Sequence, residues 1–149
     1  MRSTRGPLNS WTAKDGKAFE ERAACVVKQY GQYKVVDEIK INSKLTLGED
    51  LADLGGLVLA WEAWKAHMKG RTLENRDGLT PEQRFFVGFA QWDCNDVRPE
   101  MARLHAKVDP HSPGRWRING VVVNHPSFQE AFSCKSGAPM APTQRCGVW

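Results

Sequence analysis

Two carboxylates on one apolar segment are the first residues whose spacing could do chemistry. Glu49 and Asp53 stand four residues apart, so both face the same side of a helix. In one interpretation they belong to an ordinary helix start, where Glu49 and Asp50 complement the helix dipole. In the other, one carboxylate binds a metal and the second orients a histidine ligand, as in zinc sites. Spacing alone leaves both interpretations open.

A histidine and an arginine form a second candidate pair. His111 and Arg117 lie six residues apart across a proline and glycine turn. Each alone is typical of an ordinary loop or edge-strand residue, but together they could enter one cleft and bind an oxyanion and a carbonyl. His67, His105 and His125 have no histidine at i+4, so they predict no self-sufficient metal site.

The composition indicates one globular domain over residues 1–149. Hydrophobic residues make up 41% of the chain and charged residues 26%, and no apolar run approaches the roughly 20 residues of a membrane span. Residues 1–10 carry two arginines with no apolar stretch behind them, so we expect no signal peptide on this chain. The 21 basic residues are interleaved with 17 acidic ones, which argues against nucleic-acid binding despite the net charge of +4.

The four cysteines do not predict a zinc ribbon. Cys25, Cys94, Cys134 and Cys146 show no C-x-x-C spacing. Disulfides in an oxidising compartment and buried thiols both remain open.

Apolar periodicity and capping residues predict a mainly α fold. Thr12 and Thr80 are expected N-caps, and Gln83 completes a capping box with Thr80. Helices are predicted over residues 12–30, 46–68, 81–94, 99–108 and 126–132. Residues 35–45 are expected to form an irregular or briefly extended connector, and the tail from residue 133 an ordered or tethered non-helical segment.

One short β-hairpin is predicted near residues 116–123. Asn119-Gly120 is the dipeptide of a type I′ turn, and it is flanked by Arg117-Ile118 and by valines at 121–123.

Four segments, in this order, resemble the C-terminal part of the neprilysin and endothelin-converting-enzyme family of zinc metallopeptidases. They read KLTLGEDLADLGGL, LTPEQRFFVGFAQWDC, HSPGRWRINGVVVNHPSFQEAFSC and the terminal CGVW, and the similarity covers essentially the whole chain. The resemblance implies the C-terminal portion of a thermolysin-like (gluzincin) catalytic domain. It also implies a metalloendopeptidase that hydrolyses oligopeptides with metal-activated water.

The resemblance implies roles for the candidate residues. Glu49 matches the family's zinc ligand, and Asp53 matches the catalytic-site carboxylate that orients a ligand histidine. His111 matches the family's transition-state stabiliser, and Arg117 matches the arginine that holds a substrate carbonyl. Asp50 stands where the family usually has Asn, which changes the expected polar contacts around it.

The segment before Cys94 departs further from the family. Trp92-Asp93-Cys94 replaces the usual Val-Trp-Cys. The resemblance places these residues at the pocket for the residue after the scissile bond, so Trp92 is an expected substrate-binding residue. The usual preference for large apolar side chains is less expected here.

No H-E-x-x-H motif occurs in the sequence. In the family that motif lies upstream, so we expect the other two Zn²⁺ ligands and the general base from a missing N-terminal part of the same enzyme. The expected partners are that part and a peptide substrate, and the isolated chain is expected to be inactive. The parent enzyme is expected to be extracellular, periplasmic or in the cell envelope. The alternative is a non-catalytic peptide- or partner-binding module that retains the fold.

The resemblance also implies one disulfide, between Cys25 and Cys146, with Cys94 and Cys134 free. An exposed apolar face is expected where the missing zinc-binding helix would pack. Its residues are Leu51, Leu54, Gly55, Val58 and Leu59.

Overall fold

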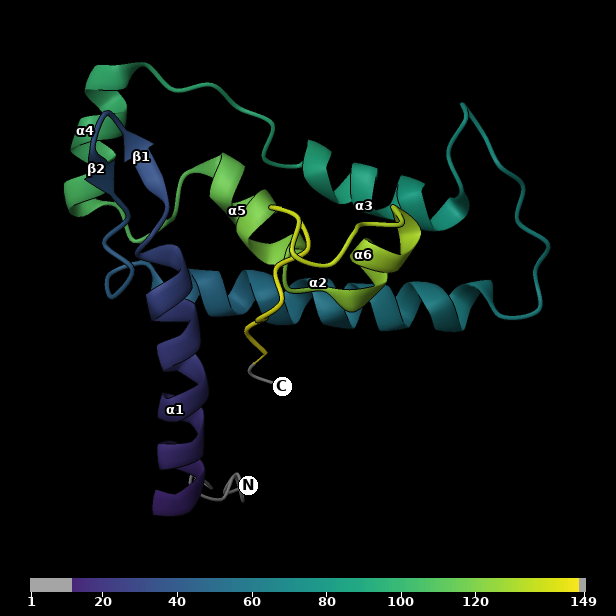
Figure 1. Cartoon of the computed structure of the whole chain (residues 1–149), viewed down its shortest axis with the longest axis horizontal. Coiled ribbons are helices and arrows are strands. Elements are labelled where there is room, and N and C mark those ends of the chain that lie inside the picture. The colour runs from purple at the N-terminus through teal and green to yellow at the C-terminus, as the bar shows by residue number, and fades with distance from the viewer. Residues whose placement is uncertain (1–11, 148–149) are drawn as a thin grey trace, which may run out of the picture.

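The computed structural model describes residues 12–147 and is mainly helical. The elements of this part of the chain are α1 (Ala13–Tyr30), β1 (Lys34–Val36), β2 (Ile39–Lys40), α2 (Leu47–Met68), α3 (Pro81–Gln91), α4 (Pro99–Val108), α5 (Gly114–Val122) and α6 (Pro126–Ala131). In Figure 1, α2 runs along one side with α5, α6 and α3 over it, and α1 projects from the N-terminal end of α2. Among the described helices, none has the length and apolarity to span a membrane.

The predicted helix starts are confirmed by their caps. Thr12 Oγ1 accepts from the Asp15 backbone N–H at 3.2 Å, and the Asp15 carboxylate accepts from the Thr12 N–H at 2.9 Å. The same reciprocal pair joins Thr80 and Gln83 at the start of α3. Each capping box satisfies two backbone donors that a helix N-terminus leaves free. The predicted helix end near Cys94 is wrong, because α3 stops at Gln91.

The hairpin predicted near residues 116–123 is wrong, because this segment is helix α5. Gly120 serves close packing rather than a turn: a Cβ atom there would lie 2.8 Å from the ring and hydroxyl of Tyr30 on α1. Val121 and Val122 are 1% and 3% exposed, so α5 is held by burial between α1 and α2. Tertiary packing overrides the local turn signal of Asn119-Gly120.

The two strands lie instead in the segment expected to be an irregular or extended connector. β1 and β2 pair antiparallel around a tight turn in which Asp37 has a φ of 51°. The Trp116 ring stacks on Tyr33 with centroids 4.0 Å apart, and its Nε1 donates to the Lys34 carbonyl at 2.7 Å. These contacts attach the small sheet to α5.

The core lies between α1, α2 and α5 and continues as an aromatic cluster beneath α3 and α6. The predicted apolar face of α2 is only partly exposed. Leu51 and Leu54 are buried, whereas Val58 is 41% and Leu59 73% exposed. The aromatic cluster contains Trp61, Trp64, Phe85, Phe86 and Phe128.

The predicted disulfide is present and holds the C-terminal tail on α1. Cys25 and Cys146 are bonded with Cα atoms 5.6 Å apart, while Cys94 and Cys134 are free. The bond joins residues 121 apart, and closing such a loop stabilises the fold by up to about 4.9 kcal/mol on the chain-entropy model. Asn124 reinforces the tether by accepting from the Cys146 N–H at 2.7 Å.

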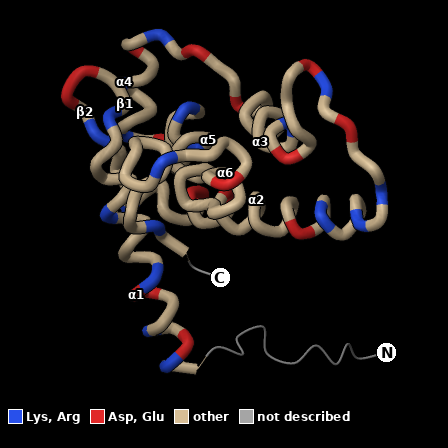
Figure 2. The backbone as a smooth tube through the Cα atoms, turned by 45° about the vertical axis from the view of Figure 1, so that its right-hand side comes forward, with Lys and Arg blue, Asp and Glu red and all other residues tan. Residues whose placement is uncertain are grey.

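Charges of both signs are mixed in space as they are in the sequence. Figure 2 shows basic and acidic segments alternating along α1 and along the C-terminal half of α2.

His125 is buried in the aromatic cluster and generates a prediction on stability. Its side chain contacts Trp61 and Phe86 at centroid distances of 5.7 and 5.4 Å, and Nδ1 has no partner within the described residues. Burial, assisted by Lys65, lowers the pKa of His125 despite the opposing charges of Glu62 and Glu130.

We expect the free energy of unfolding to fall as the pH drops below about 6.5, because the unfolded chain then binds a proton that buried His125 resists. His125→Gln should flatten this slope between about pH 5 and 7 in urea titrations. The matched control is His67→Gln at an exposed position on α2, which should keep the slope. An unchanged slope in the His125 variant would contradict the assignment.

Candidate functional site

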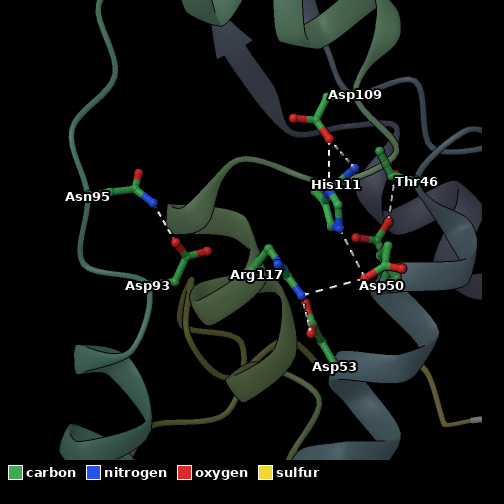
Figure 3. Close-up of polar contacts among 9 residues, drawn as sticks. Thr46, Asp50, Asp53, Asp93, Asn95, Asp109, His111 and Arg117 are labelled. Carbon is green, nitrogen blue, oxygen red and sulfur yellow. Dashed lines mark hydrogen bonds and ion pairs between the residues drawn. The ribbon is translucent and has the colours of Figure 1, made fainter.

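The centre of the candidate site is an ion pair where α5 meets α2. Arg117 on α5 donates from Nε and Nη2 to the two carboxylate oxygens of Asp53 on α2, both at 2.7 Å. The side chains are only 17% and 11% exposed, so the pair is largely shielded from water. Figure 3 shows the guanidinium directed at the Asp53 carboxylate. Bidentate geometry of this kind fixes direction as well as distance.

Glu49 lies one turn before Asp53, in the first turn of α2. Its Oε2 is 3.5 Å from His111 Nε2 and 3.8 Å from Arg117 Nη2. The Glu49 side chain remains 43% exposed, so its carboxylate is accessible to a ligand. The structure thus brings together the two pairs of residues that the sequence offered separately.

Asp109 fixes the orientation of His111. Its Oδ1 accepts from the His111 backbone N–H at 2.9 Å and lies 2.8 Å from Nδ1 of the same residue. The backbone N–H of His111 is also the main reason that the pKa of Asp109 is lowered. The other ring nitrogen, Nε2, is left facing Glu49. Sequence reasoning missed Asp109, although an aspartate two residues before an N–H that its side chain accepts is ordinary Asx-turn chemistry.

Trp92 is the fifth predicted site residue, and it also lies here. The Arg117 guanidinium carbon stands 4.7 Å from the centroid of the Trp92 ring, a cation–π contact. Trp92 follows the last residue of α3 and is 49% exposed. Arg117 is therefore held between an aromatic face and a carboxylate.

Beneath these residues lies a buried acid, Asp50. It is 1% exposed; its Oδ2 accepts from Thr46 Oγ1 at 2.8 Å, and its Oδ1 has no partner among the described residues. Burial raises the pKa of Asp50 to about 6, against the opposing influence of the Ser112 and Thr46 hydroxyls. The buried Tyr30 hydroxyl also has no hydrogen-bond partner among the described residues. Its pKa is raised by burial and by the charge of Asp50.

The site opens into a cavity of about 470 Å³ between the small sheet, α4 and the start of α5. His111, Ser112, Arg117, Asp93 and Asp109 are among its lining residues. A volume of this size is typical of a ligand pocket.

The described residues do not form a complete metal centre. Within residues 12–147 no group of three or more His, Cys, Asp or Glu side chains is arranged to hold a metal ion. Glu49 fits the carboxylate ligand of a zinc site, because zinc accepts carboxylate oxygen and this carboxylate is both exposed and backed by oriented donors.

The sequence matches peptidase family M13 over residues 2–148. The chain belongs to this family. It is 42% identical over 145 residues to Neprilysin-1 of Caenorhabditis elegans, covering 93% of this chain and 19% of the relative. It is 41% identical over 142 residues to endothelin-converting enzyme 1 of Bos taurus, with the same two coverages.

Solved structures of the zinc metalloprotease Zmp1 of Mycobacterium tuberculosis share the fold. The open state superposes with a TM-score of 0.89 at 34% identity, covering 95% of this chain and 23% of Zmp1. The inhibitor complex gives a TM-score of 0.88. This M13 chain therefore spans about a fifth of the length of the curated relatives it matches.

Asp50 generates a prediction about stability in this M13 chain. A carboxyl whose pKa is raised on folding stabilises the fold below about pH 4 and loses that contribution as the pH rises through 6. We expect Asp50→Asn to be more stable than the parent by about 2 to 3 kcal/mol at pH 8 and equal to it near pH 4. The amide can keep the Thr46 contact and donate to Ser112.

Urea unfolding of both proteins at the two pH values measures this difference. Asp96→Asn, at an exposed position that lines the cavity of about 470 Å³, is the control and should change stability at neither pH. A destabilised Asp50→Asn variant at pH 8 would contradict the account of Asp50.

Proposed function

We propose that this chain is the C-terminal segment of the catalytic domain of a zinc metalloendopeptidase that hydrolyses peptide bonds in oligopeptides. Membership of family M13 supports the class of reaction. The observation that carries the proposal is the convergence of Glu49, His111 and Arg117: they come from separate segments, yet His111 and Arg117 lie 3.5 and 3.8 Å from one carboxylate oxygen of Glu49.

Glu49 is proposed as one ligand of the zinc ion. Zinc, when bound, supplies Lewis-acid polarisation of the scissile carbonyl and activates water at neutral pH. Asp53 is proposed to orient a ligand histidine from the upstream part of the enzyme, while its bonds to Arg117 hold it in place.

His111 is proposed to stabilise the oxyanion that forms when water attacks the substrate. Nδ1 is paired with Asp109, so a donating Nε2 requires a protonated ring. The Asp109 and Glu49 carboxylates flank the ring on opposite nitrogens. A donor fixed before the reaction stabilises charge that appears only in the transition state.

Arg117 is proposed to hold a peptide carbonyl next to the scissile bond. Nε and Nη2 are engaged by Asp53, whereas Nη1 has no hydrogen bond or ion pair within residues 12–147. Trp92 covers the guanidinium at 4.7 Å and forms an apolar wall beside that free donor. The pair can therefore bind a substrate backbone without breaking the contact to Asp53.

The proposed partners are a peptide substrate and the upstream part of the same enzyme, which would bring the remaining two zinc ligands and the general base. Residues 1–149 alone are then inactive. An extracellular, periplasmic or envelope location is proposed for the whole enzyme, and the Cys25–Cys146 disulfide supports an oxidising compartment.

The proposal predicts four distinguishable losses in a protein that joins this chain to an upstream segment carrying H-E-x-x-H. Glu49→Ala should abolish tight zinc binding, and Asp53→Asn should lower metal affinity or activity by about 10- to 100-fold. His111→Ala should lower kcat by roughly 10²- to 10³-fold with little change in KM. Arg117→Ala should mainly raise KM, because its carbonyl contact exists in both ground and transition states.

Steady-state kinetics on a fluorogenic peptide, with zinc content measured for each variant, test these expectations. Glu100→Ala on the exposed side of α4 is the control and should retain full activity. Full activity in the Glu49 or His111 variant would show that these roles are misassigned. A joined protein that binds the peptide and zinc but cleaves nothing would favour the non-catalytic binding module.

A further inference from the structure

The turn that follows α3 is pressed against the first residue of α5. A Cβ atom on Gly114 would lie 2.8 Å from the Asp93 carbonyl oxygen and from Asn95 Nδ2, and 2.9 Å from Asp93 Cγ. The Asn95 backbone N–H donates to the Asp93 carbonyl at 3.0 Å and closes the turn. Because Arg117 lies one helical turn after Gly114, this close approach sets where the Asp93 carboxylate stands relative to the Arg117 guanidinium.

Asp93 is a site carboxylate that no cation neutralises through direct contact. Its Oδ1 accepts from the Asn95 side-chain amide, and it forms no ion pair within residues 12–147. By contrast, Asp53 is paired with Arg117, and Asp109 with His111. Figure 3 shows Arg117 between Asp53 on one side and Asp93 on the other.

The charge of Asp93 acts on the Arg117 guanidinium. Hydrogen bonds from Arg117 to Asp53 are the main cause of the raised pKa of Arg117, and the charges of Asp53, Asp93 and Glu49 add to it. Asp93 lines the same cavity of about 470 Å³ as Arg117 and His111.

The cavity that Asp93 lines also contains a second arginine and a buried hydroxyl. Its other arginine, Arg115, is stacked over Trp116, with the guanidinium carbon 4.7 Å from the ring centroid. The lining also includes Ser112, which is 3% exposed and whose hydroxyl acts on the buried Asp50 carboxyl.

We propose that Asp93 determines specificity, selecting peptides with a basic side chain next to the carbonyl that Arg117 holds. The inference rests on the proposed function, because it takes the peptide position from the free Nη1 of Arg117. A carbonyl bound there places the adjacent side chain beside Asp93, where a lysine or arginine would meet an unpaired negative charge. Because the site is partly open to water, the gain is modest, about 5- to 10-fold in affinity.

Binding of matched peptides to the full chain tests the inference without requiring catalysis. Acetyl-Ala-Lys-Ala-amide is compared with acetyl-Ala-norleucine-Ala-amide, which has a similar aliphatic side chain but no ammonium group. We expect the lysine peptide to bind about 5- to 10-fold more tightly in NMR titrations at low salt. Asp93→Asn should make the two equal, and raising the salt should reduce the difference for the parent chain. Glu100→Gln is the charge-matched control and should preserve the ratio.

The norleucine peptide reports on the proposed function separately. If Arg117→Ala does not weaken its binding, the carbonyl-holding role of Arg117 fails, whatever the ratio shows. Equal affinities in the parent chain, a ratio that survives in a folded Asp93→Asn variant, or a ratio insensitive to salt would each overturn the inference. If neither peptide binds the folded chain, both the peptide site and the role of Asp93 are overturned.

Discussion

The ion pair between Arg117 and Asp53 is the contact on which the arrangement of the site depends. Removing two charges from water costs several kcal/mol per ion, and two hydrogen bonds of 2.7 Å in a matched bidentate geometry offset that cost. The pair fixes α5 against α2. Glu49 lies one turn before Asp53, and the loop that carries His111 leads into α5. The contact between Arg117 and Asp53 therefore also sets the 3.5 Å distance between Glu49 and His111.

Close helix packing lets this pair form. Gly120 allows α5 to approach the Tyr30 ring, and Gly114 allows the turn at Asp93 to reach the start of the same helix. A Cβ atom on Gly120 would come within 3 Å of the buried Tyr30 side chain, and one on Gly114 would come within 3 Å of the Asp93 backbone carbonyl. The two glycines therefore help to position the site, because Gly120 sets the distance between α5 and α1, and Gly114 sets the distance between α5 and the turn that carries Asp93.

Local chemistry made the helices predictable, while the site needed three-dimensional information. Thr12 and Thr80 mark helix starts through bonds within their own first turns, so sequence reasoning found them. The error at Asn119-Gly120 arose because the same dipeptide suits a hairpin turn and a close helix contact, and only the presence of Tyr30 decides between them. Residue type and spacing singled out Glu49, Asp53, His111 and Arg117 as candidates, but Trp92 and the roles of all five came from the family resemblance. Asp109 and the approach of Asp93 to Arg117 were missed because they depend on a loop and on contacts between distant segments.

The most direct test of this account is a double-mutant cycle on the central pair. The free energy of unfolding would be measured in urea at pH 7 for the parent chain, Asp53→Asn, Arg117→Gln and the double variant. Residues that share a partly buried ion pair couple by 0.5 to 3 kcal/mol, and the geometry here predicts about 2 kcal/mol. A coupling energy near zero would show that Arg117 and Asp53 do not hold α5 on α2, and would contradict the account.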